Sequence, residues 1–380
     1  ASLTTANLTV TANSVNKIYG QALTFGSGST AFTSSGLRGV DSIASVTLTD
    51  TNSGGLVTAN AGGTYALTPS LATGSSFSAS NYSITYNNGA LTVTPAPLAI
   101  YLTGTYNGTT SYTNGNATIR LAGLVTADAA GSVTGVTINN QNVASANYIS
   151  AITGVSGFTL ANYAINTGTN STLSGSNPVV GATNLLSTNL VSLSKANASL
   201  TGSQIYNGTT SFSASNLTVT GVNSEVLTIT GSGTLGSSGN VQTSQNLSSV
   251  AGLTLGGGTA DNYNLSTGQS TVSVTPAPLA IYLTGTYNGT TSYTNGNATI
   301  RLAGLVTADA AGSVTGVTIN NQNVASANYI SAITGVSGFT LANYAINTGT
   351  NSTLSGSNPV VGATNLLSTN LVSLSKASLG

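Results

Sequence analysis

The sequence predicts an all-β fold, a tandem array of small β-sandwich or β-grasp-like modules that form an elongated rod. The first observation is an internal repeat, because residues Val93–Ala196 recur without a change as Val274–Ala377, an offset of 274 − 93 = 181 positions. The second is the alternation of apolar residues with Thr, Ser and Asn, which Gly interrupts too often for helices. A continuous β-solenoid is the alternative architecture.

Two short motifs divide the chain into modules. Tyr-Asn-Gly-Thr-Thr begins at Tyr106, Tyr206 and Tyr287, and Lys-Ile-Tyr-Gly at residues 17–20 takes the same place near the start of the chain. Asn-Tyr pairs stand late in each module, at residues 81–82, 162–163, 262–263 and 343–344. These motifs predict four modules at residues 1–95, 96–196, 197–276 and 277–380.

A third motif, Ala-Ser-Leu, marks module boundaries at residues 1–3, 198–200 and 377–379. Its last copy opens a module that the sequence does not contain. We therefore expect a segment of a longer array, or an array that another chain continues. The sequence begins at Ala1 without an initiator methionine or a signal peptide, as expected of a mature or excised segment.

The individual strands are predicted by apolar residues that alternate with hydroxyl residues. Residues 8–11, 91–94, 98–101 and 217–220 show this period of two, which places one face on a core and the other in water. Residues 82–86 and 90–93 flank Asn87-Asn88-Gly89 and predict a terminal hairpin with an Asn-Gly turn. Residues 127–130 predict one helical turn and little more.

Proline punctuates the boundary between modules. Thr94-Pro95-Ala96-Pro97 returns as Thr275-Pro276-Ala277-Pro278. Proline fixes φ and lacks an N–H donor, so it ends a ladder and stiffens the crossing. A short stiff crossing between β modules favours an extended rod.

Charge is almost absent from the chain. Charged residues are 3% of the sequence, with six cations and six anions and a net charge of zero. Nothing attracts nucleic acid or anionic lipid electrostatically, and no run of about 18 apolar residues exists to cross a membrane. We expect no nucleic-acid partner and no membrane insertion.

No residue set predicts catalysis. Histidine and cysteine are absent, which excludes Ser-His-Asp triads, zinc sites and haem ligation. The acids stand singly, too scattered for paired carboxylates or a calcium loop, and each is interpreted as a solvated or hydrogen-bonded turn residue. The sequence therefore predicts no enzyme activity, catalytic residue, cofactor or metal ion.

Three tyrosines are the candidate ligand or interface residues: Tyr106, Tyr206 and Tyr287. Each stands beside Asn-Gly, where an aromatic ring could line a sugar-binding ledge. The alternative is that each ring seals the edge of its module's core and leaves the hydroxyl at the surface.

Two repeat families resemble these modules. Residues 17–20 with residues 81–93 resemble the MBG repeat domain, and the Tyr-Asn-Gly-Thr-Thr modules resemble the YDG repeat domain, with Asn107, Asn207 and Asn288 in place of its Asp. The resemblance covers nearly the whole chain and makes residues 1–95 MBG-like, 96–196 and 277–380 YDG-like, and 197–276 divergent YDG-like. Both domains occur in arrays in large bacterial filamentous-haemagglutinin-like surface adhesins. The resemblance implies an extracellular or cell-surface location and carries no catalytic residues.

The expected function is structural. The first hypothesis is the stalk of a secreted bacterial adhesin, and the second is a self-assembling extracellular fibre or sheath of the biofilm kind, since little charge opposes lateral association. The third is a glycan-binding module. The expected partners are copies of the chain itself, adjoining repeats of a longer chain, and host or matrix glycans bound through regions that the sequence does not contain.

Overall fold

The computed structural model describes residues 3–164, 189–236, 238–345 and 370–378. The chain forms two compact units, Ala1–Lys195 and Ala196–Gly380. We use the names modules 1 to 4 for residues 1–95, 96–196, 197–276 and 277–380, so that two modules fall in each unit. Ala1, Ser2 and Leu379 of the boundary motif lie outside the described residues.

The predicted all-β fold is confirmed. Throughout the described ranges, the elements are β-strands and single turns of 3-10 helix. The helical turn predicted at residues 127–130 appears as a 3-10 turn at Thr126–Asp128. Within these ranges the chain has no helix with the length and apolar character needed to cross a bilayer.

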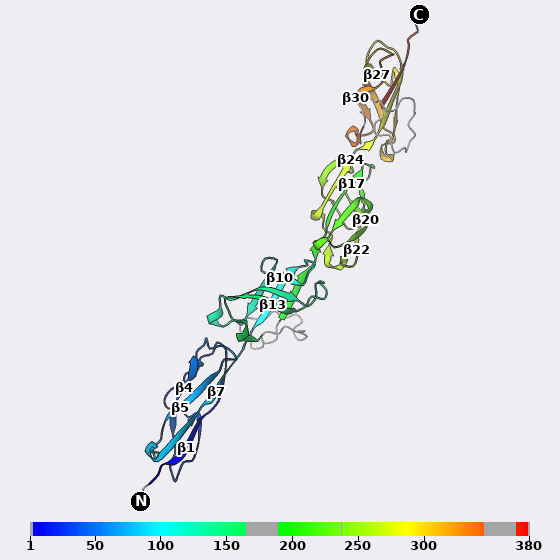
Figure 1. Cartoon of the computed structure of the whole chain (residues 1–380). Coiled ribbons are helices and arrows are strands. Elements are labelled where there is room, and N and C mark those ends of the chain that lie inside the picture. Colours follow the sequence, from blue (N-terminus) through cyan, green and yellow to red (C-terminus); the bar gives the residue numbers. More distant parts are fainter. Residues whose placement is uncertain (1–2, 165–188, 237, 346–369, 379–380) are drawn as a thin grey trace. The chain divides into compact units, whose positions relative to one another are not determined.

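Module 1 is a β-sandwich of two sheets, with strand orders β3-β1-β6 and β2-β7-β5-β4. Because side chains alternate on β1, Leu8, Val10 and Ala12 all face the interior of the module. Leu48 and Leu91 of the other sheet pack in the same core. In Figure 1, β4, β5 and β7 run beside one another in that second sheet. Its elements are β1 Ala6–Ala12, β2 Val15–Ile18, β3 Phe32–Ser35, β4 Ser45–Asp50, η1 Thr51–Ser53, β5 Tyr65–Thr73, η2 Ala79–Asn81, β6 Tyr82–Asn87 and β7 Gly89–Thr94.

The terminal hairpin predicted for module 1 is wrong. β6 and β7 are neighbours in sequence, but β6 pairs in parallel with β1 and β7 in parallel with β2. The chain therefore changes sheets at Asn88. A Cβ on Gly89 would lie 2.5 Å from the carbonyl oxygen of Ala12, so the two crossing segments approach closer than a side chain allows. Long-range parallel pairing overrides the local turn preference here.

Modules 2 and 4 have the same architecture, as their shared sequence requires. Each has one sheet of order β11-β9-β15 or β28-β26-β32 and another of order β10-β12-β13 or β27-β29-β30. Module 2 contains β8 Ala96–Pro97, β9 Ala99–Thr105, β10 Ser111–Thr113, β11 Ala117–Ala122, η3 Thr126–Asp128, β12 Ser132–Ile138, β13 Ile149–Ser156, η4 Leu160–Asn162, β14 Tyr163–Ala164 and β15 Asn189–Ser194. Module 4 contains β25 Ala277–Pro278, β26 Ala280–Thr286, β27 Ser292–Thr294, β28 Ala298–Ala303, η10 Thr307–Asp309, β29 Ser313–Ile319, β30 Ile330–Ser337, η11 Leu341–Asn343, β31 Tyr344–Ala345 and β32 Asn370–Ser375.

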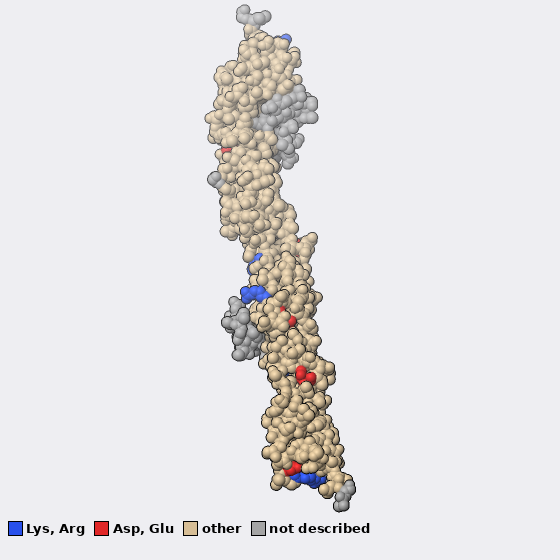
Figure 2. Space-filling model, turned by 90° about the vertical axis from the view of Figure 1, so that its left-hand side faces the viewer, with Lys and Arg blue, Asp and Glu red and all other residues tan. Residues whose placement is uncertain are grey.

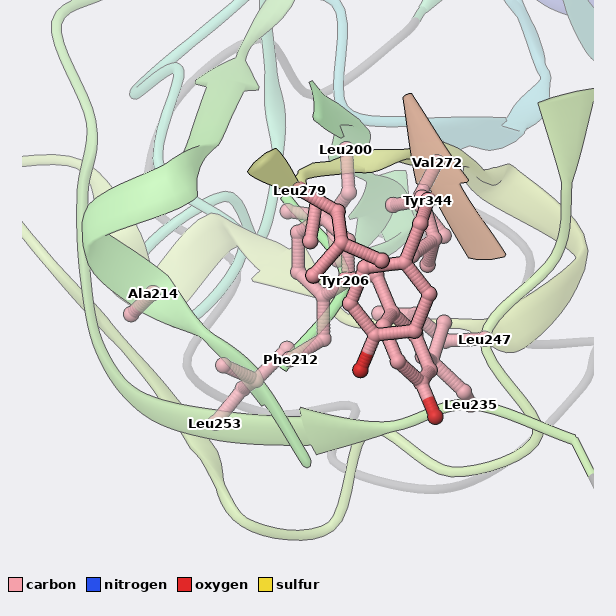
Figure 3. Packing of buried hydrophobic residues seen from close by; sticks show 12 residues of the cluster. Leu200, Tyr206, Phe212, Ala214, Leu235, Leu247, Leu253, Val272, Leu279 and Tyr344 are labelled. Atoms are coloured by element: carbon pink, nitrogen blue, oxygen red, sulfur yellow. The ribbon is translucent and has the colours of Figure 1, made fainter. Parts of the chain in front are cut away.

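Module 3 has sheets of order β19-β17-β24-β21 and β18-β20-β22. Leu200 and Val272 from the first sheet and Phe212 and Leu253 from the second share one core (Figure 3). Its elements are β16 Ala196–Asn197, β17 Ser199–Ile205, β18 Ser211–Ser213, η6 Ala214–Asn216, β19 Leu217–Thr220, η7 Val222–Ser224, β20 Thr228–Thr234, β21 Gln242–Gln245, β22 Leu253–Gly256, η8 Ala260–Asn262, β23 Tyr263–Asn264, η9 Thr267–Gln269 and β24 Ser270–Thr275.

In every module an early strand pairs in parallel with a late one: β1 with β6, β9 with β15, β17 with β24 and β26 with β32. In modules 2, 3 and 4 these are the long first strand and the last strand. Because they run in the same direction, the chain enters such a module at one end and leaves it at the other. In the described residues, each sheet is built from strands of a single module. The modules are therefore tandem β-sandwiches and not rungs of one continuous solenoid.

The proline segments join consecutive modules within a unit. β7 ends at Thr94, Pro95 interrupts the strand, and β8 begins at Ala96, where it pairs with β14. Pro276 stands in the same place between β24 and β25. A single residue therefore separates the last strand of one module from the first strand of the next. Figure 2 shows how few charged side chains lie on one face of the molecule.

Candidate functional site at the module junctions

Each module contains the same hydrogen-bonded corner, built from its Asn-Tyr pair and one acid. The tyrosine hydroxyl donates to a carboxylate oxygen in the pairs Tyr82–Asp41, Tyr163–Asp128, Tyr263–Glu225 and Tyr344–Asp309, at 2.7, 2.7, 2.8 and 2.7 Å respectively. The same hydroxyl accepts a backbone N–H from Arg38, Val125, Val222 or Val306. We call each set of Asn, Tyr and acid the Asn–Tyr corner.

Local structure places the corner at one edge of the module. In all four modules the asparagine ends a 3-10 turn and the tyrosine begins the next strand. In modules 2 and 4 the acid ends another 3-10 turn, at Asp128 and Asp309. Turns hold these residues where backbone groups are accessible for side-chain hydrogen bonds.

In unit 1 the corner of module 2 receives a tyrosine from module 1. The Tyr19 hydroxyl donates to Oδ2 of Asp128 over 3.0 Å, so this oxygen accepts two phenolic hydroxyls. The rings of Tyr19 and Tyr163 meet edge to face, with centroids 5.5 Å apart and planes at 77°. An edge-to-face pair contributes about 0.5–1.5 kcal/mol beyond its buried area. Tyr19 and Tyr163 are 5% and 6% exposed.

Asn162 supplies the second contact between modules 1 and 2. Its Oδ1 accepts the N–H of Ala61 over 2.9 Å, and its Nδ2 donates to Oδ1 of Asn60 over 3.0 Å. The side chain is 2% exposed. A buried amide needs partners for both ends, and module 1 provides one for each.

Close packing completes the junction of unit 1. Gly20 has φ +87°, and a Cβ there would lie 2.3 Å from Cγ1 of Val125. Glycine is required at this point both for its backbone conformation and for the approach of module 2. Around it, Tyr19 and Val93 pack with Leu98 and Tyr163 in one apolar cluster.

Unit 2 repeats this junction between modules 3 and 4. Tyr206 donates to Oδ2 of Asp309 over 3.0 Å, and its ring lies 5.6 Å from that of Tyr344 at 80°. Figure 3 shows the two rings side by side among the apolar side chains of the cluster. Unit 2 therefore repeats both the hydrogen bond and the ring geometry of unit 1.

The amide contact and the close-packed glycine also recur. Asn343 accepts the N–H of Val241 over 3.0 Å and donates to Oδ1 of Asn240 over 2.9 Å. A Cβ on Gly208, which has φ +74°, would lie 2.6 Å from that of Ala308. Four matched contacts thus define the junction in both units.

Burial keeps the phenols of the junction protonated. Desolvation is the main cause that raises the pKa of Tyr163 above its usual range, and the hydrogen bond to Asp128 is the second. Desolvation and the hydrogen bond to Asp309 raise the pKa of Tyr344 in the same way. The same causes raise the pKa of Tyr19 and Tyr206. A phenolate next to a carboxylate would be repelled and poorly solvated, so the neutral phenol persists as a donor.

The three tyrosines proposed from the sequence as ligand or interface residues have different environments in the structure. Tyr106 is buried at 2% exposure, and Tyr206, at 7%, has its hydroxyl on Asp309 instead of at the surface. Tyr287 is 38% exposed. The three lie in different modules, so the structure does not bring them together into one site.

Sequence reasoning missed the role of the acids across the junctions. It placed Asp128 on a turn, as the structure does, but did not connect it to Tyr19 of another module. A signal was present, because the acid precedes the tyrosine of its own corner by 41, 35, 38 and 35 positions in modules 1 to 4. That regular spacing pairs each acid with one Asn-Tyr motif.

Comparison with known families assigns two of the modules. Residues 8–92 match the MBG domain (YGX type), and residues 190–271 match the YDG domain. The chain carries an MBG domain and a YDG domain in tandem. These are non-catalytic domain types of the repeat or binding kind. No curated protein and no solved structure matches the chain significantly.

The family matches include the residues that bind the Asn–Tyr corner of the following module. The MBG match contains Tyr19 and Asn60, and the YDG match contains Tyr206 and Asn240. These polar groups bind one another across the junction, and the arrangement fixes one sandwich against the next. Both domain types therefore offer an equivalent surface to the identical corners of modules 2 and 4.

Proposed function

We propose that the chain is a structural, non-catalytic segment of a secreted bacterial surface protein, acting as the extended stalk of a large adhesin. The observation that supports this most directly is the recurrence of one junction, Tyr19–Asp128 in unit 1 and Tyr206–Asp309 in unit 2, with the same 3.0 Å bond. A stalk needs neighbouring modules held in a fixed orientation, and this junction provides such a hold.

Three further features support a load-bearing role. A one-residue linker leaves little freedom between modules, and proline at that residue removes more. The parallel first and last strands of modules 2, 3 and 4 bring the chain in at one end of the module and out at the other. Buried hydrogen bonds and close glycine contacts resist bending at the joint. Together these features favour a spacer that projects a binding region away from the cell.

The location and the lack of enzyme activity belong to the same proposal. MBG and YDG domains favour a repeat or binding segment, and the resemblance to surface adhesins favours the cell exterior. The cysteine-free composition is compatible with export and an oxidising environment. Adhesion itself would then reside in other regions of the protein.

Small-angle X-ray scattering on the full chain tests the stalk. A compact globule of 380 residues would have a radius of gyration of about 21 Å. We expect at least twice that value, independent of concentration, with a cross-section of one sandwich. A radius near that of the globule would contradict the proposal.

Junction variants sharpen this test. Tyr19→Ala combined with Tyr206→Ala is expected to shorten the maximum dimension, because the joints would flex. The control is Leu71→Ala, a change at a side chain that is 72% exposed and away from both junctions. If the double variant and the control scatter alike, the junctions do not hold the modules in place.

A further inference from the structure

The chain contains six Asn-Gly pairs, and they differ in how firmly the structure holds the two residues. In such a pair the glycine nitrogen can attack the side-chain amide carbon of the asparagine, because glycine has no Cβ to hinder the approach. Both groups must leave their resting positions to react, so hydrogen bonds or packing that hold either group oppose the attack. The pairs begin at Asn88, Asn107, Asn114, Asn207, Asn288 and Asn295.

Hydrogen bonds hold the asparagine in the three pairs of the Tyr-Asn-Gly motif. Oδ1 of Asn107 accepts the backbone N–H of Thr109 over 2.9 Å and its hydroxyl over 3.0 Å, and Nδ2 donates to the carbonyl oxygen of Ser111 over 3.1 Å. Asn288 makes the same three bonds, and Asn207 makes the two through its Oδ1. Asn288 is exposed, so hydrogen bonds and not burial keep its amide in place.

Asn88 is held through the glycine that follows it. Gly89 is buried at the start of β7, and a Cβ there would lie 2.5 Å from the carbonyl oxygen of Ala12. This close packing prevents the glycine nitrogen from moving toward the asparagine side chain.

The pairs at residues 114–115 and 295–296 are held by neither means. They lie in the turns from β10 to β11 and from β27 to β28, and both residues of each pair are exposed. In module 2, Asn116 closes the turn, because its N–H donates to the carbonyl oxygen of Thr113 and its Oδ1 accepts the N–H of Thr113. Module 4 has the same two bonds. Among the described residues, none forms a hydrogen bond with the asparagine side chain of either pair.

We propose that Asn114 and Asn295 are sites of spontaneous deamidation, whereas the asparagines of the Tyr-Asn-Gly motif are protected. The nitrogen of Gly115 forms a bond to Cγ of Asn114 while the bond from Cγ to Nδ2 breaks. The N–H proton passes to the leaving group, which departs as ammonia and leaves a succinimide ring. Water then adds to either carbonyl carbon of the ring and opens it to aspartate or isoaspartate. The reaction at Asn295 is the same.

Deamidation would change the charge and the backbone of these two turns. Each event replaces a neutral amide with a carboxylate, in a chain that has six cations, six anions and a formal net charge of zero. Isoaspartate also adds one carbon to the backbone of a turn that joins the two sheets of its module. Since net charge opposes association, the modified chain would associate less readily with its own copies.

Peptide mapping of the full chain by mass spectrometry tests the selectivity. After incubation in mildly alkaline buffer, chymotrypsin separates residues 107–112 from residues 113–121 at Tyr112, and module 4 gives the same two peptides. We expect deamidation to be at least about ten-fold faster in the second peptide, because side-chain hydrogen bonds must break only in the first. In a chain unfolded by guanidinium chloride, the two peptides should deamidate at similar rates.

Two variants of module 2 contain an internal control, because the substituted peptide differs in mass from the unchanged peptide of module 4. Thr109→Val removes the hydroxyl that donates to Oδ1 of Asn107 and should accelerate deamidation there several-fold. Gly115→Ala should slow deamidation at Asn114 at least about ten-fold. A Cβ at position 115 would lie 3.6 Å from Oγ1 of Thr113, so the turn accommodates alanine.

The unfolded chain gives the outcomes that would overturn the proposal. Equal rates at Asn107 and Asn114 in the folded chain would show that the hydrogen bonds of the motif do not protect it. Absence of deamidation at Asn114 in the folded chain, while the unfolded chain reacts, would show that the turn itself blocks the attack.

Discussion

Tyr19 donates a hydrogen bond to Asp128 over 3.0 Å, across 109 positions of sequence and from one module to the next. Tyr206 and Asp309 form the same bond at the same distance. Tyr19 belongs to an MBG domain and Tyr206 to a YDG domain, so two domain families meet identical partners through one geometry. The two junctions therefore share one geometry although the modules that supply the tyrosine match different families.

The acid at the junction is predicted to be its most sensitive residue. Asp128→Ala removes the acceptor of two largely buried phenols, and bonds to charged groups contribute about 1.5–3 kcal/mol each. We expect the free energy of unfolding of unit 1 to fall by about 2–3 kcal/mol in urea titrations followed by tyrosine fluorescence. Asp261→Ala, at an exposed acid of unit 2, should change the free energy of unfolding of that unit by less than about 0.5 kcal/mol. Equal effects would refute the role assigned to Asp128.

Glycine at the junction can be tested with a matched pair. Gly20 and Gly289 both have positive φ, +87° and +79°, so alanine strains the backbone similarly at each. Only at Gly20 would the new Cβ meet another module, 2.3 Å from Val125. We expect Gly20→Ala to destabilise its unit by about 1–3 kcal/mol more than Gly289→Ala, measured by calorimetry. Similar losses of stability at both sites would mean that module 2 shifts to make room for the new Cβ at no energetic cost.

The asparagine of the corner gives a second matched pair. Asn162→Ala leaves the N–H of Ala61 and the amide of Asn60 without their partner, at an expected cost of about 1–3 kcal/mol. Asn81→Ala changes the same residue in an exposed corner and should cost less than about 0.5 kcal/mol. Amide hydrogen exchange at Ala61 should accelerate in the first variant and not in the second.

Alkaline pH should loosen the junctions. The pKa of Tyr163 is raised, mainly by desolvation, so the folded state keeps this proton at a pH where the unfolded chain has lost it. The resulting stability is fully present below about pH 10 and is lost as the pH rises through the folded-state pKa. Phenolate absorbance should show Tyr163 and Tyr344 ionising last, after Tyr263, whose pKa is raised to about 12.

A single substitution can show that Tyr163 is one of the phenols that ionise last. Tyr163→Phe should remove one late-ionising phenol from the absorbance titration. Tyr263→Phe should instead remove a phenol that ionises earlier, with a pKa of about 12. A titration in which both changes affect the same part of the curve would contradict the environment described for Tyr163.

The strands could be predicted to the extent that they depend on local pattern. Residues 91–94 alternate as predicted, and β7 buries every second residue. Residues 99–102 of β9 are buried on both faces, which alternation does not predict. The hairpin at Asn88-Gly89 was wrong because β6 and β7 each pair with a segment more than seventy positions earlier, and no local rule contains those partners.

The sequence alone determined the module type and the array, because apolar period and long identical repeats are properties of the chain itself. It also contained the Asn-Tyr motifs and the isolated acids. Only the tertiary structure decided that Asp128 serves Tyr19 as well as Tyr163, because a hydrogen bond depends on positions within about 3 Å that two separately folded sandwiches must bring together. The same reason applies to Tyr206, whose motif is visible in the sequence but whose hydrogen bond to Asp309 of the next module is not.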